Sequence, residues 1–366
     1  MPDAASQQHR PRYPPGRLDS CVDQRDGFGF PFEGQLAHAR LRARRHGSGY
    51  GLGMALQAQR RAGSPDGEPA EHYSQHSRYS DPGAHAQLLQ AVPPDLATVS
   101  AVARNTIAHY RASSVPLPES SNADINARWI SRILDLDQQR HGVPLQNERA
   151  EAERVQGCCR DHTLLAVAIL RQHGVPARSR VGFATYLWPD SRVDHVVAET
   201  WTGDRWRRFD PELPGPRASV DDPLDIPTGA DSPFLIAAAA WSGYRQSGGA
   251  IDDLGVQVGS LEFKGAPFVF GYLIMDVAHR FGDELLLWDY WGAMGMPGQV
   301  LDVELGDRLA DLVLRADAGN QQAEQELADI YAADPRVHPG PQVLQFSPRG
   351  EPPRQVALPD RSPATA

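Results

Sequence analysis

Residues 156–178 read QGCCRDHTLLAVAILRQHGVPAR and contain two of the three cysteines of the 366-residue chain. Between residues 161 and 173 apolar side chains recur on nearly every side, which predicts a buried central helix. Pro176 prevents this helix from continuing. The thiols of Cys158 and Cys159 therefore lie where a buried helix begins. The pair could be a metal site, a redox site, or one nucleophile beside an inert neighbour.

A metal or redox role is the weaker interpretation of the adjacent cysteines. The segment contains four potential zinc ligands, which are Cys158, Cys159, Asp161 and His162. However, adjacent cysteines fit one tetrahedral ion poorly, and the chain has no Cys-x-x-Cys pair. A disulfide between neighbours strains the peptide that joins them, and three cysteines do not form a disulfide scaffold. We therefore expect reduced thiols, no metal and a cytoplasmic location.

Composition and charge limit the possible partners. The formal net charge is -10, which argues against general nucleic-acid binding. Hydrophobic residues make up 41% of the chain, enough for a sizeable core. The longest apolar run, residues 234–241, is too short to span a bilayer, and no signal peptide is visible. We expect neither nucleic acid nor a membrane as a partner.

The chain divides into four parts by composition and periodicity. Residues 1–70 are rich in arginine, glycine and proline and predict a disordered basic extension. Residues 79–300 predict one folded domain, with a core motif at 156–214. Residues 301–337 predict a helical part and residues 338–366 an irregular tail. The expected helices are 84–112 with a break at Pro93-Pro94, 122–141 and 161–173, and the expected strands are 177–187, 195–201 and 205–212.

The helix start at the two cysteines suits a sulfur nucleophile. A nucleophilic cysteine must be a thiolate, and the free N–H groups of a helix N-terminus favour that anion. A thiolate also needs a proton-transfer partner, usually histidine, and the imidazole needs an acceptor that fixes its tautomer. The sequence must therefore supply a histidine and a carboxylate near this helix start.

A predicted hairpin brings such a pair together. Thr202 and Gly203 form a turn signal between the second and third predicted strands. A tight turn there places His195 opposite Asp210, to within a residue or two. Cross-strand neighbours lie about 5 Å apart, so imidazole and carboxylate are expected to meet.

These residues together resemble bacterial members of the transglutaminase-like superfamily. The resemblance rests on Gly157-Cys158-Cys159-Arg160-Asp161, Leu170-Arg171, Gly174-Val175-Pro176-Ala177-Arg178, Gly182-Phe183, Asp194-His195, Trp206 and Asp210-Pro211. It implies an α+β fold with a papain-like, transglutaminase-type core, in which a central helix packs on an antiparallel sheet between flanking helices. Relatives have twelve residues from the nucleophile to the arginine of Leu-Arg, and this count implies Cys159 rather than Cys158.

The resemblance also assigns roles around the nucleophile. It implies His195 as general base, Asp210 as its orienting partner and the Cys159 N–H as one oxyanion donor. Relatives often take a second donor from an upstream glutamine or tryptophan, and Gln146 and Gln156 are the candidates here. Trp201 is a candidate for lining the cleft.

The sequence departs from its relatives immediately after the orienting aspartate. Many relatives have Asp-Pro-Thr where this chain has Asp210-Pro211-Glu212.

The expected activity is cysteine-dependent acyl transfer on an amide or peptide carbonyl through a thioester. The substrate would be a peptide, a protein or a small amide, with an amine as possible co-substrate, and no cofactor is needed. Two alternatives remain open. One is a cysteine protease or amidase with the same triad, and the other is a catalytically silent binding protein on this fold.

Overall fold

The structure is a computed structural model that describes residues 71–188, 191–217, 219–229, 231–248, 251–258, 261–295 and 299–358. The basic extension predicted at residues 1–70 lies outside these residues. Among the described residues, no helix combines the length and the apolar character needed to cross a bilayer.

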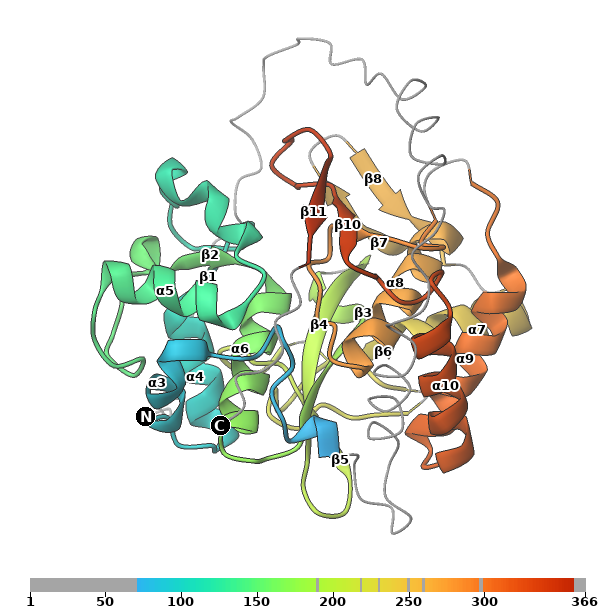
Figure 1. Ribbon diagram of the computed structural model, residues 1–366, viewed down its shortest axis with the longest axis horizontal. Helices are drawn as coiled ribbons and strands as arrows, with labels where there is room; N and C mark the ends of the chain where they lie inside the picture. Colours follow the sequence, from blue (N-terminus) through green and yellow to red (C-terminus); the bar gives the residue numbers. More distant parts are fainter. Residues whose placement is uncertain are drawn as a thin grey trace, which may run out of the picture. The chain divides into compact units, whose positions relative to one another are not determined.

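A six-stranded sheet forms the centre of the fold (Figure 1). Its strands are β3 (Ala177–Trp188), β4 (Ser191–Trp201), β5 (Trp206–Phe209), β6 (Phe234–Ile236), β7 (Leu254–Val258) and β8 (Leu261–Lys264). Their order is β6-β3-β4-β7-β8, and β5 also pairs with β4. All pairs are antiparallel except β4–β7, which is parallel. The three strands predicted around the hairpin are thus present, and the α+β prediction is confirmed.

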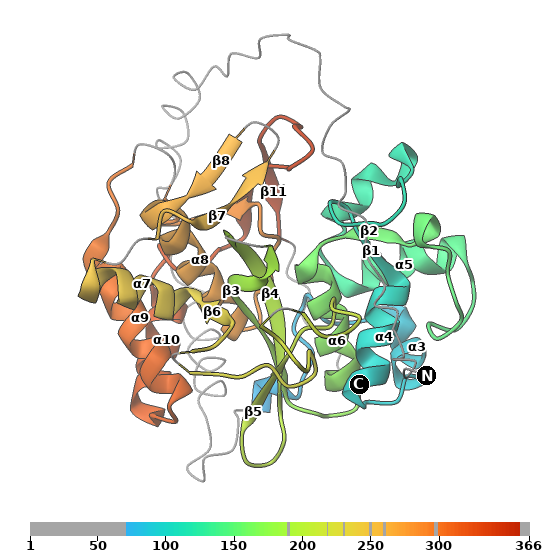
Figure 2. The same ribbon diagram turned by 180° about the vertical axis from the view of Figure 1, so that it is seen from behind.

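Two buried helices lie on opposite sides of strands β3 and β4 (Figures 1 and 2). One is α6 (Cys159–Gln172), the predicted central helix, and the other is α8 (Gly265–Arg280). The hydroxyl of Thr163 on α6 donates to the Val196 carbonyl of β4 at 2.9 Å. On the other side, the N–H of Val181 on β3 donates to the Asp276 carboxylate of α8 at 2.8 Å. The Thr163 bond ties α6 to the strand that carries His195, and the Asp276 bond ties α8 to the neighbouring strand.

The helices before α6 differ in detail from the predicted ones. They are η1 (Glu71–Tyr73), η2 (Gly83–His85), α3 (Ala86–Gln90), α4 (Leu96–Thr106), η3 (Glu119–Asn126), α5 (Ile130–Arg140) and η4 (Glu151–Glu153). The prolines break the first helix as predicted, and the Asp95 carboxylate accepts from the Thr98 N–H at 2.9 Å to cap α4. The single helix predicted over 122–141 is wrong, because the left-handed backbone at Arg128, with a φ of 35°, separates η3 from α5. Strands β1 (Ile107–His109) and β2 (Val155–Gly157) pair in parallel just before α6. The helix predicted up to residue 112 is therefore wrong over its last six residues, which form β1 and a turn.

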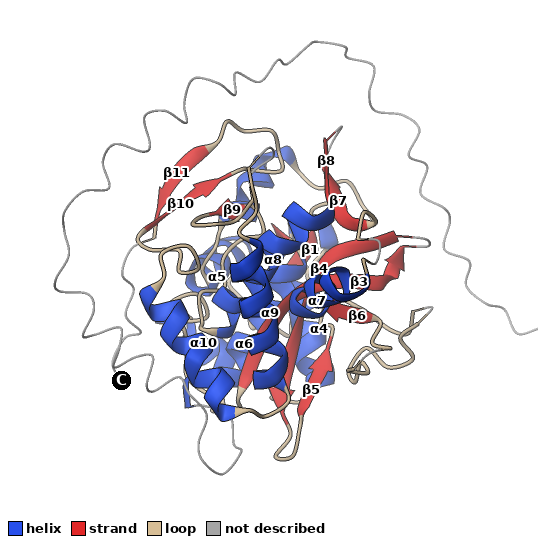
Figure 3. Ribbon diagram, turned by 90° about the vertical axis from the view of Figure 1, so that its right-hand side faces the viewer, coloured by secondary structure: helices blue, strands red, loops and turns tan. Residues whose placement is uncertain are grey.

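The C-terminal part contains three further helices and a small second sheet (Figure 3). The helices are α7 (Ala237–Ser247), α9 (Val303–Asp317) and α10 (Gln321–Ala333), and the strands are β9 (Asp289–Tyr290), β10 (Gln342–Gln345) and β11 (Arg354–Ala357). The prediction of an irregular tail over 338–366 is therefore wrong for its described part. Strand β10 pairs with both β9 and β11, and β9 lies about fifty residues upstream, so no local pattern marks it.

A buried ionic cluster joins β3, β4 and β5 around one carboxylate. Glu199 on β4 binds Arg178 at 2.8 Å, Arg208 at 2.8 Å and Arg180 at 3.4 Å. Burial opposes ionisation of Glu199, but the three guanidinium groups outweigh it and lower the pKa to about 2. Glu199 therefore lies at the centre of a buried group of ion pairs within the sheet.

Glu199→Gln is expected to destabilise the protein by about 3–5 kcal/mol, because it leaves buried guanidinium groups without their shared anion. The pKa of Glu199 is lower in the folded protein than in the unfolded chain. Ionised Glu199 therefore contributes to the free energy of unfolding above about pH 4.5, and this contribution is lost as pH falls towards 2. That contribution is about 3 kcal/mol. Urea unfolding between pH 7 and 3 measures both effects. Glu326→Gln, at an exposed ion pair with Arg308, is the matched control and should change stability by less than about 0.5 kcal/mol.

Candidate active site

The start of α6 is built by a reciprocal capping arrangement around Cys158. The Asp161 N–H donates to the Cys158 sulfur, and the Cys158 N–H donates to the Asp161 carboxylate at 2.9 Å. Gly157 is required just before it, because a Cβ there would lie 2.8 Å from that carboxylate. Cys158 thus serves as the cap of α6, and Cys159 is the first residue of the helix.

Two further side chains hold this helix end in place. Arg160 pairs with Asp161 at 2.7 Å, and its Nε donates to the Glu284 carbonyl at 3.1 Å. The ring nitrogens of His162 lie 3.0 Å from the Cys158 carbonyl and 3.2 Å from the Ile107 carbonyl. Asp161 and His162, two of the potential metal ligands in the segment, therefore act in building the helix start.

His195 lies on β4, and its Nε2 is 2.7 Å from the Asp210 carboxylate. The same carboxylate accepts the Tyr186 hydroxyl at 2.9 Å and the Glu212 N–H at 3.0 Å. Three donors therefore converge on a fully buried aspartate. Because Asp210 holds Nε2, the Nδ1 atom of His195 is left for a reacting group.

The hairpin register explains which residues meet. The predicted turn would place Ala198 opposite Arg207, but the structure pairs Ala198 with Phe209, a shift of two residues. Because side chains alternate with a period of two, this shift keeps Asp210 on the predicted face. It also moves Asp210 to a diagonal position and brings Glu212 towards His195. Glu212 was not predicted as a site residue, and its only sequence signal is the departure from Asp-Pro-Thr.

Cys159, His195 and Glu212 meet at one point. One donor atom from each, the Cys159 sulfur, a His195 ring nitrogen and a Glu212 oxygen, lie within 4.8 Å of one another. Cys159 is 5% exposed and His195 is 2% exposed. The Glu212 Oε2 atom is buried and has no hydrogen-bond partner among the described residues. The arrangement places a thiol and an imidazole close together, beside a carboxylate with one buried oxygen that accepts no hydrogen bond among the described residues.

The local electrostatics oppose a free thiolate at Cys159. The Cys159 thiol donates a hydrogen bond to Cys158; this bond, burial and the carboxylates of Glu212 and Asp194 raise its pKa well above the usual range. The helix start favours the anion, as the sequence suggested, but these effects outweigh it. Without substrate, the resting state of Cys159 is the thiol.

The charges around His195 favour the imidazolium. Burial lowers the pKa of His195, but the charge and hydrogen bond of Asp210 outweigh it, and the pKa is raised. For Asp210 itself, burial opposes ionisation, but His195 and the Tyr186 hydroxyl outweigh it and lower the pKa. Burial raises the pKa of Glu212. His195 is thus poised to accept a proton while Asp210 stays ionised.

Glu212→Gln is expected to speed alkylation of Cys159 by iodoacetamide about tenfold at pH 7. The substitution removes a carboxylate that raises the thiol pKa, and a shift of about one pKa unit is a tenfold change in thiolate. Mass spectrometry of the labelled peptide follows the rate against pH. Glu326→Gln serves as the matched control, and equal rates in the two variants would show that Glu212 does not act on the thiol.

The other predicted site residues lie elsewhere. The Gln156 side chain donates to the Pro118 carbonyl and the Ser121 hydroxyl. It also accepts from Arg349. Gln146 is exposed and donates to the Ala91 carbonyl at 2.8 Å. Both amides are engaged away from Cys159, so neither placement supports an oxyanion donor.

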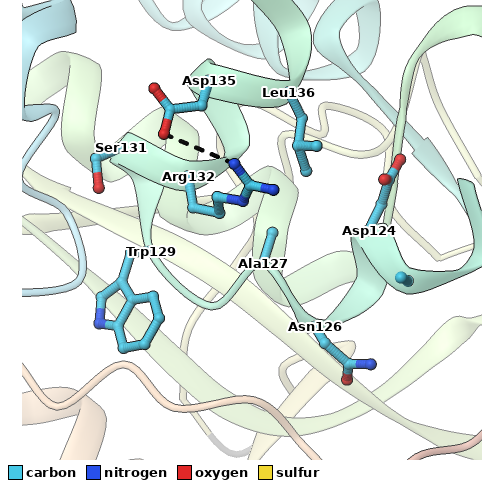
Figure 4. A pocket seen from close by; sticks show the side chains of 9 residues that line it. Asp124, Asn126, Ala127, Trp129, Ser131, Arg132, Asp135 and Leu136 are labelled. Atoms are coloured by element: carbon cyan, nitrogen blue, oxygen red, sulfur yellow. Dashed lines mark ion pairs between the residues drawn. The ribbon is translucent and has the colours of Figure 1, made fainter. Parts of the chain in front are cut away.

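Trp201 also lies away from the reacting groups. It is six residues beyond His195 on β4, which corresponds to about 20 Å of extended strand. It borders a cavity of about 470 Å³ together with Leu170 at the other end of α6. A second cavity, of about 290 Å³, lies between η3 and α5 and is bordered by Trp129, Arg132 and Asp135 (Figure 4). Neither cavity is lined by Cys159, His195 or Asp210.

Comparison with known proteins finds one family that is similar to this core. Residues 119–211 match the family described as the transglutaminase-like superfamily. None of the curated proteins matches the chain. A solved structure described as "a putative cysteine protease from Cytophaga hutchinsonii" aligns at 20% identity and a TM-score of 0.24. That alignment covers 43% of this chain and 47% of the other, so it spans less than half of either.

The family match includes the start of α6, the His195 strand and Asp210, and it ends one residue before Glu212. Over residues 119–211 the chain is therefore similar to the transglutaminase-like superfamily.

Proposed function

We propose that this protein catalyses cysteine-dependent acyl transfer on an amide or peptide carbonyl. Cys159 is the nucleophile, His195 the general base and Asp210 the group that orients the imidazole. The observation that carries the proposal is the linked geometry of these three residues. The Cys159 sulfur and a His195 nitrogen lie within 4.8 Å, while His195 Nε2 is held by a buried carboxylate at 2.7 Å.

The raised thiol pKa determines how the first step proceeds. The proton leaves the Cys159 sulfur for His195 Nδ1 as the sulfur attacks the carbonyl carbon, so no standing thiolate is required. The oxyanion that forms lies near the first N–H groups of α6, among them that of Cys159. The imidazolium then gives its proton to the leaving amine, and the C–N bond breaks to leave a thioester on Cys159.

A second nucleophile resolves the thioester. His195 accepts its proton, the new bond to the carbonyl carbon forms, and the C–S bond breaks to regenerate the thiol. The carboxylate of Glu212 supports an amine in this role, because it can bind the incoming ammonium group and accept one of its protons, so that the neutral amine attacks and His195 takes the next proton. We therefore assign transfer to an amine as the main reaction and hydrolysis as the competing one.

We propose His109 on β1 as the second oxyanion donor in place of the two glutamines, because it pairs with Gly157 of β2, two residues before Cys159. Its Nδ1 accepts from the Arg111 N–H at 3.1 Å, so the proton is on Nε2. Burial, together with the charge of nearby His195, lowers its pKa to about 3, which keeps the ring neutral at physiological pH.

The test incubates the full chain with a mixed library of short peptide amides and a fluorescent primary amine. Mass spectrometry should find fluorescent amide adducts with the wild-type protein and none with Cys159→Ala. Cleaved amides without adducts would mean that water is the acceptor and that the protein is an amidase or protease. Absence of both products, with Cys159 still reactive towards iodoacetamide, would contradict acyl transfer.

A further inference from the structure

The point where Cys159, His195 and Glu212 meet has the donor chemistry of a metal site. The residues come from three separate elements: the first turn of α6, strand β4 and the loop that follows β5. Thiolate, imidazole and carboxylate are the three side-chain ligands that zinc uses, and three protein ligands with one open position are typical of exchangeable sites.

The distances require only a small adjustment. The donor atoms lie within 4.8 Å of one another. In a tetrahedral zinc site with bonds of about 2.0–2.3 Å, the ligand atoms lie roughly 3.3–3.8 Å apart, so they must close by about 1 Å. Rotation of the Glu212 side chain can supply the part of this movement that involves its own oxygen, because its Oε2 atom has no hydrogen bond to break among the described residues. The Cys159 and His195 donor atoms must close through their own side-chain torsions.

The surroundings already orient the imidazole as a metal ligand. Metal-bound histidines usually donate their second N–H to a carboxylate, which fixes the ring and raises its basicity. Asp210 does this for His195 at Nε2, which leaves Nδ1 as the ring nitrogen available to a metal ion. Asp210 in turn accepts hydrogen bonds from the Tyr186 hydroxyl and the Glu212 N–H, so the carboxylate that orients His195 is itself held in place.

The local charge also favours a cation. The charges of Glu212 and Asp194 act on the Cys159 thiol, and Asp194 accepts the Tyr272 hydroxyl at 2.6 Å. Asp210 is paired with His195. Glu212 is the carboxylate whose buried oxygen lacks a partner. A divalent cation would neutralise it.

We infer that this site binds one thiophilic divalent cation of the Zn²⁺ type through Cys159 Sγ, His195 Nδ1 and the Glu212 carboxylate, with water in the fourth position. Binding breaks the S–H bond, forms the metal–sulfur bond and releases the proton to solvent. The ion occupies both the nucleophile and its base, so it inhibits reversibly any reaction that uses them. Only this consequence rests on the proposed acyl transfer; the binding itself does not.

The test uses the metal-free full chain and measures binding directly. Zn²⁺ is titrated in competition with a chromophoric chelator, and Mg²⁺ serves as a hard cation without thiolate affinity. Co²⁺ is added in a parallel experiment, because a thiolate ligand gives a sulfur-to-cobalt charge-transfer band in the near ultraviolet. The variants are Cys159→Ser, Cys158→Ala, Glu212→Gln and Asp210→Asn, with Glu326→Gln as the remote matched control.

We expect one Zn²⁺ per wild-type chain. Cys159→Ser should lose the site and the cobalt band, whereas Cys158→Ala should keep the band. Asp210→Asn should weaken Zn²⁺ about 10- to 100-fold, the usual effect of removing the partner of a metal-bound histidine, and Glu212→Gln by at least as much. Circular dichroism and the unfolding midpoint verify that each variant is folded.

Besides a failure of the wild-type chain to bind Zn²⁺, two results would overturn the inference. One is equal Zn²⁺ affinity in Glu212→Gln and Glu326→Gln, which would remove Glu212 from the ligand set. The other is a cobalt band that persists in Cys159→Ser and vanishes in Cys158→Ala. Zinc binding without any acyl transfer would contradict the proposed function alone, and acyl transfer without zinc binding would contradict this inference alone.

Discussion

Cys159→Ala is expected to abolish acyl transfer, with a loss on the order of 10⁴-fold or more, as is usual when the nucleophile of a catalytic triad is removed. Cys159 is the first residue of α6, with its sulfur within 4.8 Å of a His195 nitrogen. Alkylation by iodoacetamide at neutral pH should disappear from the peptide that contains residues 158 and 159. Peptide mapping after labelling measures this effect, and the amine-adduct assay measures the activity.

Cys158→Ala is the matched control, because it removes the adjacent sulfur and leaves the nucleophile. Cys158 caps the helix through the Asp161 N–H, so this change is expected to cost about 0.5–2 kcal/mol of stability. It also removes the acceptor of the Cys159 thiol, which raises the Cys159 pKa in the wild type, so labelling should become faster. Labelling that persists in Cys159→Ala and vanishes in Cys158→Ala would reverse the assignment.

Much of the site could be predicted from the sequence, because its elements are local. The buried helix was predicted from apolar residues alone, and α6 begins within two residues of the predicted start. The hairpin that joins His195 to Asp210 requires only one short turn. The two-residue error in the predicted register does not separate His195 from Asp210, because a shift of two residues keeps each side chain on the same face of the sheet. The same error left Glu212 out of the predicted site, because Glu212 comes opposite His195 only in the register that the structure shows.

The residues that sequence analysis placed wrongly depend on distant contacts. Gln156 was a plausible oxyanion donor by position, but its amide is engaged by residues 118 and 121 and by Arg349 near the C-terminus. Strand β10 forms only because β9 and β11 lie on either side of it. Such pairings cost loop-closure entropy and leave no periodic signal in a short segment. Such contacts can be predicted only when the distant residue that pairs with the segment is known.

Asp210→Asn is expected to reduce acyl transfer by about 10²- to 10⁴-fold, although it preserves the shape of the side chain. The carboxylate accepts three donors: His195 Nε2 and the Tyr186 hydroxyl on Oδ2, and the Glu212 N–H on Oδ1. An amide has one acceptor oxygen, so its NH₂ group must face at least one of these donors. Either the His195 tautomer is lost or the Glu212 loop shifts, and both outcomes remove the aligned base.

The pH dependence separates this catalytic effect from loss of folding. In the wild type, Asp210 outweighs burial and raises the pKa of His195. Without that charge, burial is opposed only by the smaller effects of Glu212 and Asp194, so the pKa falls and the acidic limb of the pH–rate profile moves to lower pH. Tyr186→Phe removes one donor and leaves the charge, so it should lower the rate much less and leave that limb close to its place. If the two variants gave the same profile, the carboxylate would serve packing alone, because only its charge distinguishes the two substitutions at His195.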